Sequence, residues 1–183
     1  MRISFCIAAF ALVLPAAAQG SSMVIGSGLA RMCFEAADAE RASPAMLDLC
    51  NRALIDEPLS FADQVATYVN RGIIRARMND LSGAVADYDR AISLDPSEPE
   101  AYLNKGALVL KQQDWRKARE LFEAALQRHT TRPEFAYFGR AITSEIAGDL
   151  SGALADYRKA SELAPAWDGP KKELARFTVR KKG

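Results

Sequence analysis

The sequence predicts an all-α protein built from repeated pairs of antiparallel helices, with nine helices and no strand. The first observation is a period, because Tyr68 and Tyr102 lie 34 residues apart and Tyr102 and Tyr137 lie 35 apart. The second is that Ala84 and Ala118 keep the same spacing of 34 residues. The third is the alanine content of 33 in 183 residues, since a small side chain lets two helix backbones approach closely. A period of this length is typical of helix pairs stacked in an array.

Composition and charge exclude several classes of protein. With 49% hydrophobic residues, the chain has enough apolar surface to bury a core. The 24 Lys and Arg residues balance the 23 Asp and Glu residues, which excludes a protein held to nucleic acid by bulk charge. His129 is the single histidine, so neither a histidine-based metal site nor a histidine-dependent triad is available. We therefore expect no enzyme activity, no cofactor, no metal and no nucleic-acid partner.

Residues 1–18 are typical of a secretory signal peptide. Arg2 gives a positive start, residues 3–14 form an uncharged apolar run, and residues 16–18 are three alanines that a signal peptidase accepts. The run is too short to span a bilayer as a helix; the alternative is an N-terminal anchor that is never cleaved. We expect cleavage after residue 18 and a flexible linker over residues 19–26. The mature protein would be exported, to the periplasm or outside the cell, with no stable membrane span.

Four repeat units follow, and each is expected to form one helix pair. They cover residues 27–60, 65–98, 99–132 and 134–167. The first unit is degenerate, and the last three share a small residue at the eighth place, alanines at the twentieth and twenty-seventh and an aromatic at the twenty-fourth. The small residues are Gly72, Gly106 and Ala141, and the aromatics are Tyr88, Phe122 and Tyr157.

Helix ends are marked by residues that satisfy free backbone groups. Aspartates are expected to cap the second helix of each clear unit, at Asp80, Asp114 and Asp149. Ser97, with Glu100 three residues later, predicts a capping box at the start of the next unit. Residues 168–183 are expected to form an amphipathic capping helix followed by a basic tail.

These positions resemble the pattern of the tetratricopeptide repeat family, in which each unit is a helix-turn-helix pair and successive units form a right-handed superhelix. The resemblance implies a protein-protein interaction module or assembly scaffold that binds a peptide or helix of a partner protein in a concave groove. The places that face this groove in the family are here Val69, Asn70, Ile73, Arg77, Leu103, Asn104, Ala107, Lys111, Phe135, Phe138 and Ile142.

Two asparagines among these residues lie one unit apart, at Asn70 and Asn104. An amide carries both a donor and an acceptor, so the pair could hold the backbone of an extended peptide; the alternative is that both are simply solvated. Family members that bind a C-terminal carboxylate use a basic clamp, whose Lys and Arg places in the last unit are here Phe135 and Gly139. Recognition of such a C-terminus is therefore not expected.

The last unit places apolar residues toward the groove. Phe135, Phe138 and Ile142 favour an apolar helix or peptide as the occupant. The alternative is that the protein's own C-terminal helix covers them through Leu174 and Phe177. The exposure of Phe138 distinguishes the two hypotheses.

Cys33 and Cys50 take the seventh and twenty-fourth places of the first unit. In the antiparallel pair that the resemblance implies, these places face each other across the turn. In an exported chain we therefore predict a Cys33–Cys50 disulfide; the alternative is two buried free thiols.

A second class of function remains open on the sequence. The end units could stack on copies of themselves, which would make the protein a structural or self-association module that forms homo-oligomers. An enzyme is the third and least favoured class.

Overall fold

The computed structural model describes residues 20–24 and 28–178; the predicted signal peptide lies outside these residues. Within the described part there are nine helices and no strand, which confirms the all-α prediction. The helices are α1 (Leu29–Asp38), α2 (Pro44–Asp56), α3 (Phe61–Arg77), α4 (Leu81–Leu94), α5 (Pro99–Lys111), α6 (Trp115–Gln127), α7 (Pro133–Ile146), α8 (Leu150–Leu163) and α9 (Asp168–Thr178).

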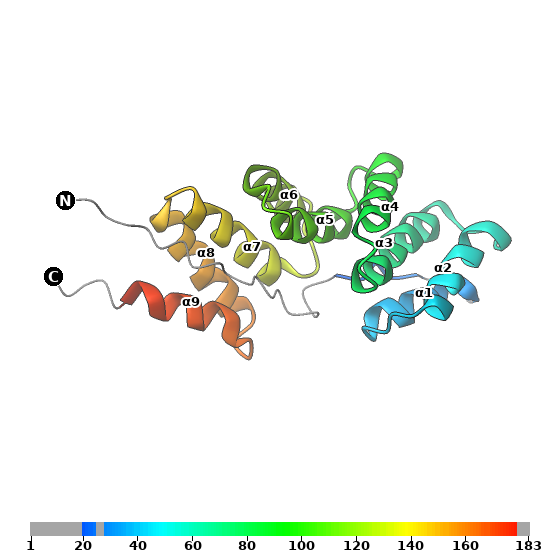
Figure 1. Cartoon of the computed structure of the whole chain (residues 1–183), viewed down its shortest axis with the longest axis horizontal. Coiled ribbons are helices and arrows are strands. Elements are labelled where there is room, and N and C mark those ends of the chain that lie inside the picture. Colours follow the sequence, from blue (N-terminus) through cyan, green and yellow to red (C-terminus); the bar gives the residue numbers. More distant parts are fainter. Residues whose placement is uncertain (1–19, 25–27, 179–183) are drawn as a thin grey trace.

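Consecutive helices pack as pairs, and the pairs follow one another along the long axis of the molecule (Figure 1). The pairs α3–α4, α5–α6 and α7–α8 correspond to the three clear repeat units. The α1–α2 hairpin packs on α3 at one end, and α9 packs on α8 at the other. Each pair buries its apolar residues against the next pair, so the core is a chain of neighbouring clusters.

The turn inside each clear unit repeats the same backbone geometry. The turn that follows each first helix contains a residue with a positive φ, at Asn79, Gln113 and Gly148. The following aspartate caps the second helix, as the sequence predicts. Asp80 Oδ1 accepts from the Gly83 N–H at 2.9 Å, and Asp149 Oδ1 accepts from the Gly152 N–H at 2.9 Å.

Small residues sit where two helices nearly touch. A Cβ added to Gly72 would lie 2.5 Å from the ring of Tyr88, and one added to Gly106 would lie 3.1 Å from the ring of Phe122. Both aromatic rings are almost fully buried. The alternation of glycine and aromatic residues in the repeat is therefore a packing requirement between the two helices of each unit.

Two local details differ from what the sequence predicts. The helix α3 begins at Phe61, four residues before the unit boundary predicted at residue 65. Ser97 does not cap α5, because Pro99 is the first helical residue and Glu98 therefore occupies the capping position and accepts from the Glu100 N–H. The Ser97 N–H instead donates to Asp95 Oδ1 at 2.8 Å.

The predicted disulfide is confirmed. Cys33 of α1 and Cys50 of α2 are bonded, with their Cα atoms 5.0 Å apart, and both residues are fully buried. The bond closes a loop across the α1–α2 hairpin, which is the unit with the poorest match to the repeat pattern.

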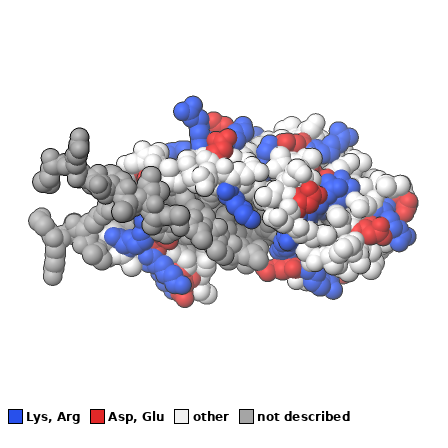
Figure 2. Space-filling model, viewed as in Figure 1, with Lys and Arg blue, Asp and Glu red and all other residues white. Residues whose placement is uncertain are grey.

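Charged residues are interspersed over the visible face of the molecule, with Lys and Arg beside Asp and Glu (Figure 2). Several ion pairs lie along exposed helix faces, such as Arg31 with Glu35 at 2.9 Å. Exposed pairs of this kind contribute little to stability. Because positive and negative side chains are interspersed on the face that Figure 2 shows, neither sign of charge dominates there.

Candidate functional site

A short segment of the chain lies against the first helices of two repeat units. Residues 20–24 run in an extended conformation across α3 towards α1 (Figure 1). Gly20, Ser22 and Val24 are buried, whereas Met23 is 71% exposed. This alternation has the period of two that is expected when one side of an extended chain faces a surface.

Asn70 holds this segment by its main chain. The Ser22 N–H donates to Asn70 Oδ1 at 3.0 Å, and Asn70 Nδ2 donates to the Ser22 carbonyl at 2.8 Å. The Asn70 side chain is fully buried, so these two bonds replace its contacts with water. One amide thus satisfies both backbone groups of one residue, in the manner of a strand partner.

Asn104 repeats the contact one unit further along. Its Nδ2 donates to the Gly20 carbonyl at 2.9 Å, two residues before Ser22. The Asn104 residue is 1% exposed, and its Oδ1 has no hydrogen-bond partner among the described residues. Of the two polar groups of the Asn104 amide, only Nδ2 is therefore hydrogen-bonded, and the buried Oδ1 lacks a donor among the described residues.

Two glutamates at the start of α5 form an acidic side to the segment. The Ser22 hydroxyl donates to Glu98 Oε1 at 2.8 Å. Burial raises the pKa of Glu98, and the hydrogen bond from Ser22 partly opposes that rise. Glu100 is 3% exposed and accepts from the Thr130 hydroxyl at 2.9 Å and the Thr131 N–H at 2.7 Å.

The Glu100 carboxylate also limits what can stand at position 20. A Cβ added to Gly20 would lie 1.9 Å from Glu100 Oε2 and 3.4 Å from Arg132 Cγ. Because the carboxylate is held by Thr130 and Thr131, it cannot move aside at little cost. The position therefore accepts only glycine while Glu100 keeps these bonds.

Val24 anchors the other end of the segment. It is fully buried and packs with Ala30, Ala53 and Ala66, which come from α1, α2 and α3. The Val24 carbonyl accepts from Arg31 Nη1 at 3.3 Å. We call the contacting residues the segment site: Asn70, Asn104, Glu98, Glu100, Ala30, Ala53 and Ala66.

Of the residues of the segment site, the sequence predicts Asn70 and Asn104 as binding residues but not the others. Residues 19–26 are expected to be a flexible linker, yet Gly20, Ser22 and Val24 within it are buried and accept or donate hydrogen bonds. The sequence assigns Glu100 to helix capping alone and gives Glu98 no role. The only pattern in the sequence that indicates this contact is weak. A glycine, a hydroxyl residue and a branched aliphatic residue stand at alternate positions, at Gly20, Ser22 and Val24.

The other predicted groove residues of α3 and α5 differ in their exposure to solvent, from fully buried to exposed. Val69 and Ile73 are fully buried in the core, and Leu103 is 1% exposed. Arg77 does not line a groove, because its Nη1 donates to the Ala37 carbonyl at 2.6 Å and so ties the end of α3 to the end of α1. Of the remaining two, Ala107 is half-buried and Lys111 is exposed at the end of α5.

The apolar residues of α7 are covered by the protein itself. Phe135 and Phe138 each lie with ring centroids 4.7 Å from the ring of Trp167, and Phe138 is 8% exposed. Ile142 packs against the clusters of both rings, and Leu174 and Phe177 of α9 pack against the cluster of Phe138. The expectation of an open apolar end is therefore wrong for these residues. The alternative hypothesis, in which the C-terminal part of the chain covers these residues, agrees with the structure. The residue that lies against both rings is Trp167, which the sequence analysis does not name.

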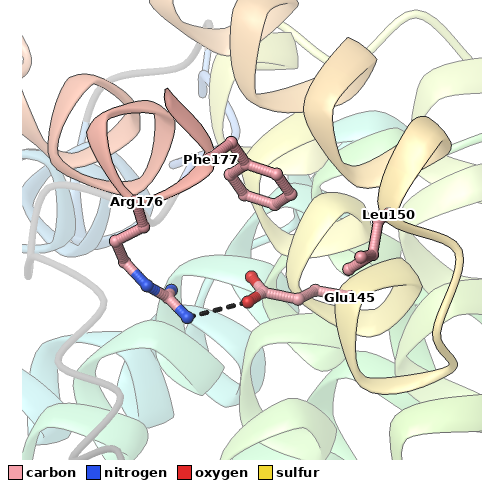
Figure 3. Close-up of a pocket in the computed structure, with 4 residues that line it drawn as sticks. All are labelled: Glu145, Leu150, Arg176 and Phe177. Atoms are coloured by element: carbon pink, nitrogen blue, oxygen red, sulfur yellow. Dashed lines mark hydrogen bonds and ion pairs between the residues drawn. The ribbon is translucent and has the colours of Figure 1, made fainter. Parts of the chain in front are cut away.

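Polar contacts fasten α9 over α7 and α8. Arg176 Nη2 donates to Glu145 Oε1 at 2.8 Å, beside a pocket bordered by Leu150 and Phe177 (Figure 3). The Tyr157 hydroxyl donates to the other oxygen of Glu145 at 3.1 Å. Burial, followed by the nearby Glu145 carboxylate, raises the pKa of Tyr157, so its hydroxyl stays protonated and able to donate.

The described part of the chain holds no group of three or more residues placed to bind a metal ion. His129 lies in the turn after α6 with a φ of 59°. Across residues 20–24 and 28–178, no helix combines the length and the apolar character needed to cross a membrane.

Comparisons with known proteins agree with this architecture. Residues 72–113 match the family model described as TPR repeat, and residues 106–166 match the one described as tetratricopeptide repeat. The chain is 30% identical over 84 residues to the Protein SGT1 homolog of Oryza sativa subsp. japonica, a match that covers 46% of this chain and 23% of that protein. It is 27% identical over 124 residues to tetratricopeptide repeat protein 16 of Macaca fascicularis, which covers 64% of this chain and 14% of the relative.

The chain thus spans less than a quarter of the length of these curated relatives. Among solved structures, the MamA RS-1 ArsTM double mutant superposes with a TM-score of 0.65 at 22% identity, covering 86% of this chain and 87% of that one. That likeness supports the fold alone.

Proposed function

Since the chain is a tetratricopeptide repeat protein, and so belongs to a class of protein-interaction modules, we propose that its segment site takes an extended peptide of a partner protein. The main chain of the partner would lie where residues 20–24 lie, with its backbone groups on Asn70 and Asn104. The protein would then act as an adaptor or assembly scaffold that holds a partner by an unstructured stretch.

One observation carries this proposal. The buried Asn70 amide makes two hydrogen bonds to the backbone N–H and C=O of a single residue, Ser22. Main-chain recognition of this kind depends on an extended conformation, and these two bonds do not involve the side chain of the bonded residue. A second asparagine stands one unit along at the position needed to bind the carbonyl two residues away.

The same geometry favours an extended peptide over a helix. A helix satisfies its own backbone groups, so it has no free N–H and C=O to offer Asn70. The apolar surface that a helix would use at Phe135 and Phe138 is occupied by Trp167. We therefore narrow the occupant from a peptide or helix to an extended peptide bound over α3 and α5.

We propose that the protein works after export, in the periplasm or, as the alternative, outside the cell. The composition of residues 1–18 supports this, and so does the Cys33–Cys50 bond, because disulfides persist in oxidising compartments. The mass of the protein isolated from the cell envelope tests the idea. A chain that begins at residue 19 is expected, and a chain that keeps residues 1–18 and fractionates with the cytoplasm contradicts it.

Crosslinked capture from the native envelope tests the interaction role. Asn70→Ala combined with Asn104→Ala should remove the captured partner, and Gln127→Ala, which changes an exposed side chain at the end of α6, should not. Circular dichroism of each variant establishes that the helices persist. If the double variant retains every partner that the wild type captures, the proposed site is wrong.

A second candidate function is self-association through the end of the array. Ile55 is 80% exposed and Phe61 is 59% exposed, at the end of α2 and the start of α3. An exposed apolar patch at this end of the array would serve as a contact surface between copies of the chain. Light scattering over a concentration series tests this function. A particle mass that rises with concentration in the wild type, and not in Ile55→Ser/Phe61→Ser, supports self-association. A monomer at every concentration eliminates it.

A further inference from the structure

The segment at residues 20–24 shows how the segment site distinguishes one sequence from another. Its main chain bonds to Asn70 and Asn104, while three alternate side chains face the protein. Each inward position meets a different surface, so affinity and specificity come from separate contacts. The chemistry of those three surfaces can be derived from their contacts.

The first inward position has no room for a side chain. At residue 20, Glu100 Oε2 stands 1.9 Å from where a Cβ would be. The carboxylate is fixed by bonds from Thr130 and Thr131. This position therefore selects glycine.

The second inward position selects a hydroxyl. Ser22 Oγ donates to Glu98 Oε1 at 2.8 Å in a site where Ser22 itself is 7% exposed. An alanine there would leave the buried carboxylate without this donor, and an acidic residue would place two carboxylates together. A serine or threonine is the residue that fits.

The third inward position selects a small branched aliphatic residue. Val24 is fully buried among Ala30, Ala53 and Ala66, whose short side chains leave space for it. A charged residue cannot be accommodated there without a partner. The two outward positions are more permissive: Met23 is exposed, and Ser21 donates to Asp38 Oδ1 at 2.9 Å, which disfavours an acidic residue there.

The segment does not satisfy the whole site. Asn104 Oδ1 is buried and lacks a donor in the part of the chain that the structure describes. A peptide that donated an N–H to this oxygen and offered a carbonyl to Nδ2 would pair both polar groups of the Asn104 amide, as Ser22 pairs both groups of Asn70. Such a ligand would make one more hydrogen bond than residues 20–24 make.

We propose, on the basis of the proposed function, that residues 20–24 are a built-in occupant of the segment site and that a partner peptide displaces them. The partner carries the same alternation: glycine, any non-acidic residue, serine or threonine, any residue, then valine or a similar branched aliphatic residue. A tethered occupant has an effective concentration in about the millimolar range, so it holds the site against weak or unmatched peptides. A matching peptide makes the same contacts as residues 20–24, and one whose main chain also donates an N–H to Asn104 Oδ1 binds more tightly than they do.

The test uses the full chain and a fluorescent peptide, Gln-Gly-Ser-Ser-Met-Val-Ile, which carries the sequence of residues 19–25. In the released variant, Ser22→Pro removes the N–H that bonds to Asn70, and Val24→Asp places a charge in a buried apolar site. The matched control makes the same two changes at the alternate positions, as Ser21→Pro with Met23→Asp. Fluorescence anisotropy should show at least about tenfold tighter binding to the released variant than to the wild type or the control.

The peptide is then varied in the same assay. Alanine for the glycine, alanine for the inward serine and aspartate for the valine should each weaken binding by about tenfold or more, whereas alanine for the methionine should leave it unchanged. Adding Asn70→Ala to the released variant should abolish its gain. Should the released variant lose its helical circular dichroism, Gly20→Leu replaces it, because that change displaces the segment and alters no helix.

Three results overturn the proposal. The first is equal binding of the peptide by the released variant and the wild type. The second is equal binding of all the altered peptides; this outcome leaves the proposed function standing and removes only the sequence pattern. The third is a dimeric wild type by light scattering in which the segment of one copy fills the site of the other. If the released variant binds no peptide of any sequence, the proposed function fails as well.

Discussion

Asn70 and Asn104 are equivalent in the repeat, but the structure predicts that replacing them by alanine has unequal effects on stability. Asn70→Ala removes two hydrogen bonds, one from the Ser22 N–H and one to the Ser22 carbonyl. Asn104→Ala removes one bond to Gly20 and also removes a buried Oδ1 that has no partner among the described residues. The first change leaves both backbone groups of Ser22 without their partner, whereas the second leaves only the Gly20 carbonyl and eliminates the unpaired Asn104 Oδ1.

The magnitudes follow from ordinary hydrogen-bond energetics. A buried hydrogen bond contributes about 1 kcal/mol net, so Asn70→Ala should lower the free energy of unfolding by about 2 kcal/mol. Asn104→Ala loses about 1 kcal/mol and regains at least about as much by removing an unsatisfied buried acceptor. We therefore expect a change close to zero, or a slight stabilisation, at Asn104.

Urea unfolding of both variants, followed by circular dichroism, measures the difference. For a chain of this size, about 2 kcal/mol also corresponds to a fall of roughly 4–8 °C in the melting temperature of Asn70→Ala. Gln127→Ala, which alters an amide at the end of α6, is the control and should match the wild type. The reasoning is refuted if Asn104→Ala costs as much as Asn70→Ala.

Three other perturbations follow from the structure. Reducing the Cys33–Cys50 bond should lower the free energy of unfolding by about 3 kcal/mol, because the bridge joins positions 17 residues apart; a Cys33→Ala/Cys50→Ala variant should not respond to reductant. Gly72→Ala should cost about 2 kcal/mol in denaturant unfolding, since overpacking against Tyr88 costs up to about 3 kcal/mol and helix propensity returns about 1 kcal/mol; an unchanged midpoint would contradict the close contact. Because the pKa of Glu98 is raised in the folded state, its protonated form favours folding, and its contribution to stability is lost as pH rises from about 4.5 through that higher pKa. Titrating stability against pH should therefore show a decline that Glu98→Gln removes, and identical profiles for the two proteins would exclude it.

The fold could be predicted from the sequence because its determinants are local and periodic. Gly72 recurs as Gly106 after 34 residues, and each faces an aromatic ring of the partner helix in its own unit. The aspartate caps depend on groups three residues away. The disulfide could be predicted for the same reason, since Cys33 and Cys50 take facing places in one hairpin.

The occupant of the site could not be predicted in this way. The bonds from Asn70 and Asn104 reach residues 48 and 84 positions earlier in the chain. No repeat relates residues 20–24 to the helices, and five residues with an alternating pattern resemble many linkers. The sequence singles out both amides and offers an extended backbone as one hypothesis for what they bind, but it does not predict that residues 20–24 of the chain lie against them.

The apolar end of the predicted groove shows a similar limit. Phe135 and Phe138 occupy groove places in the repeat, and periodicity alone cannot reveal what lies over them. Trp167 covers both rings from the turn before α9, next to the capping helix. Glu100 is a further case, because its partners Thr130 and Thr131 belong to a later turn of the array.

Hydrogen exchange at the Ser22 amide tests the central claim most directly. This N–H is bonded to the buried Asn70 side chain in the free protein, and a partner peptide with the matching pattern is proposed to take its place. Amide exchange by nuclear magnetic resonance should find Ser22 protected in the free protein and unprotected once the matching peptide is bound. A Ser22 amide that exchanges in the free protein as fast as an unstructured peptide would contradict this claim.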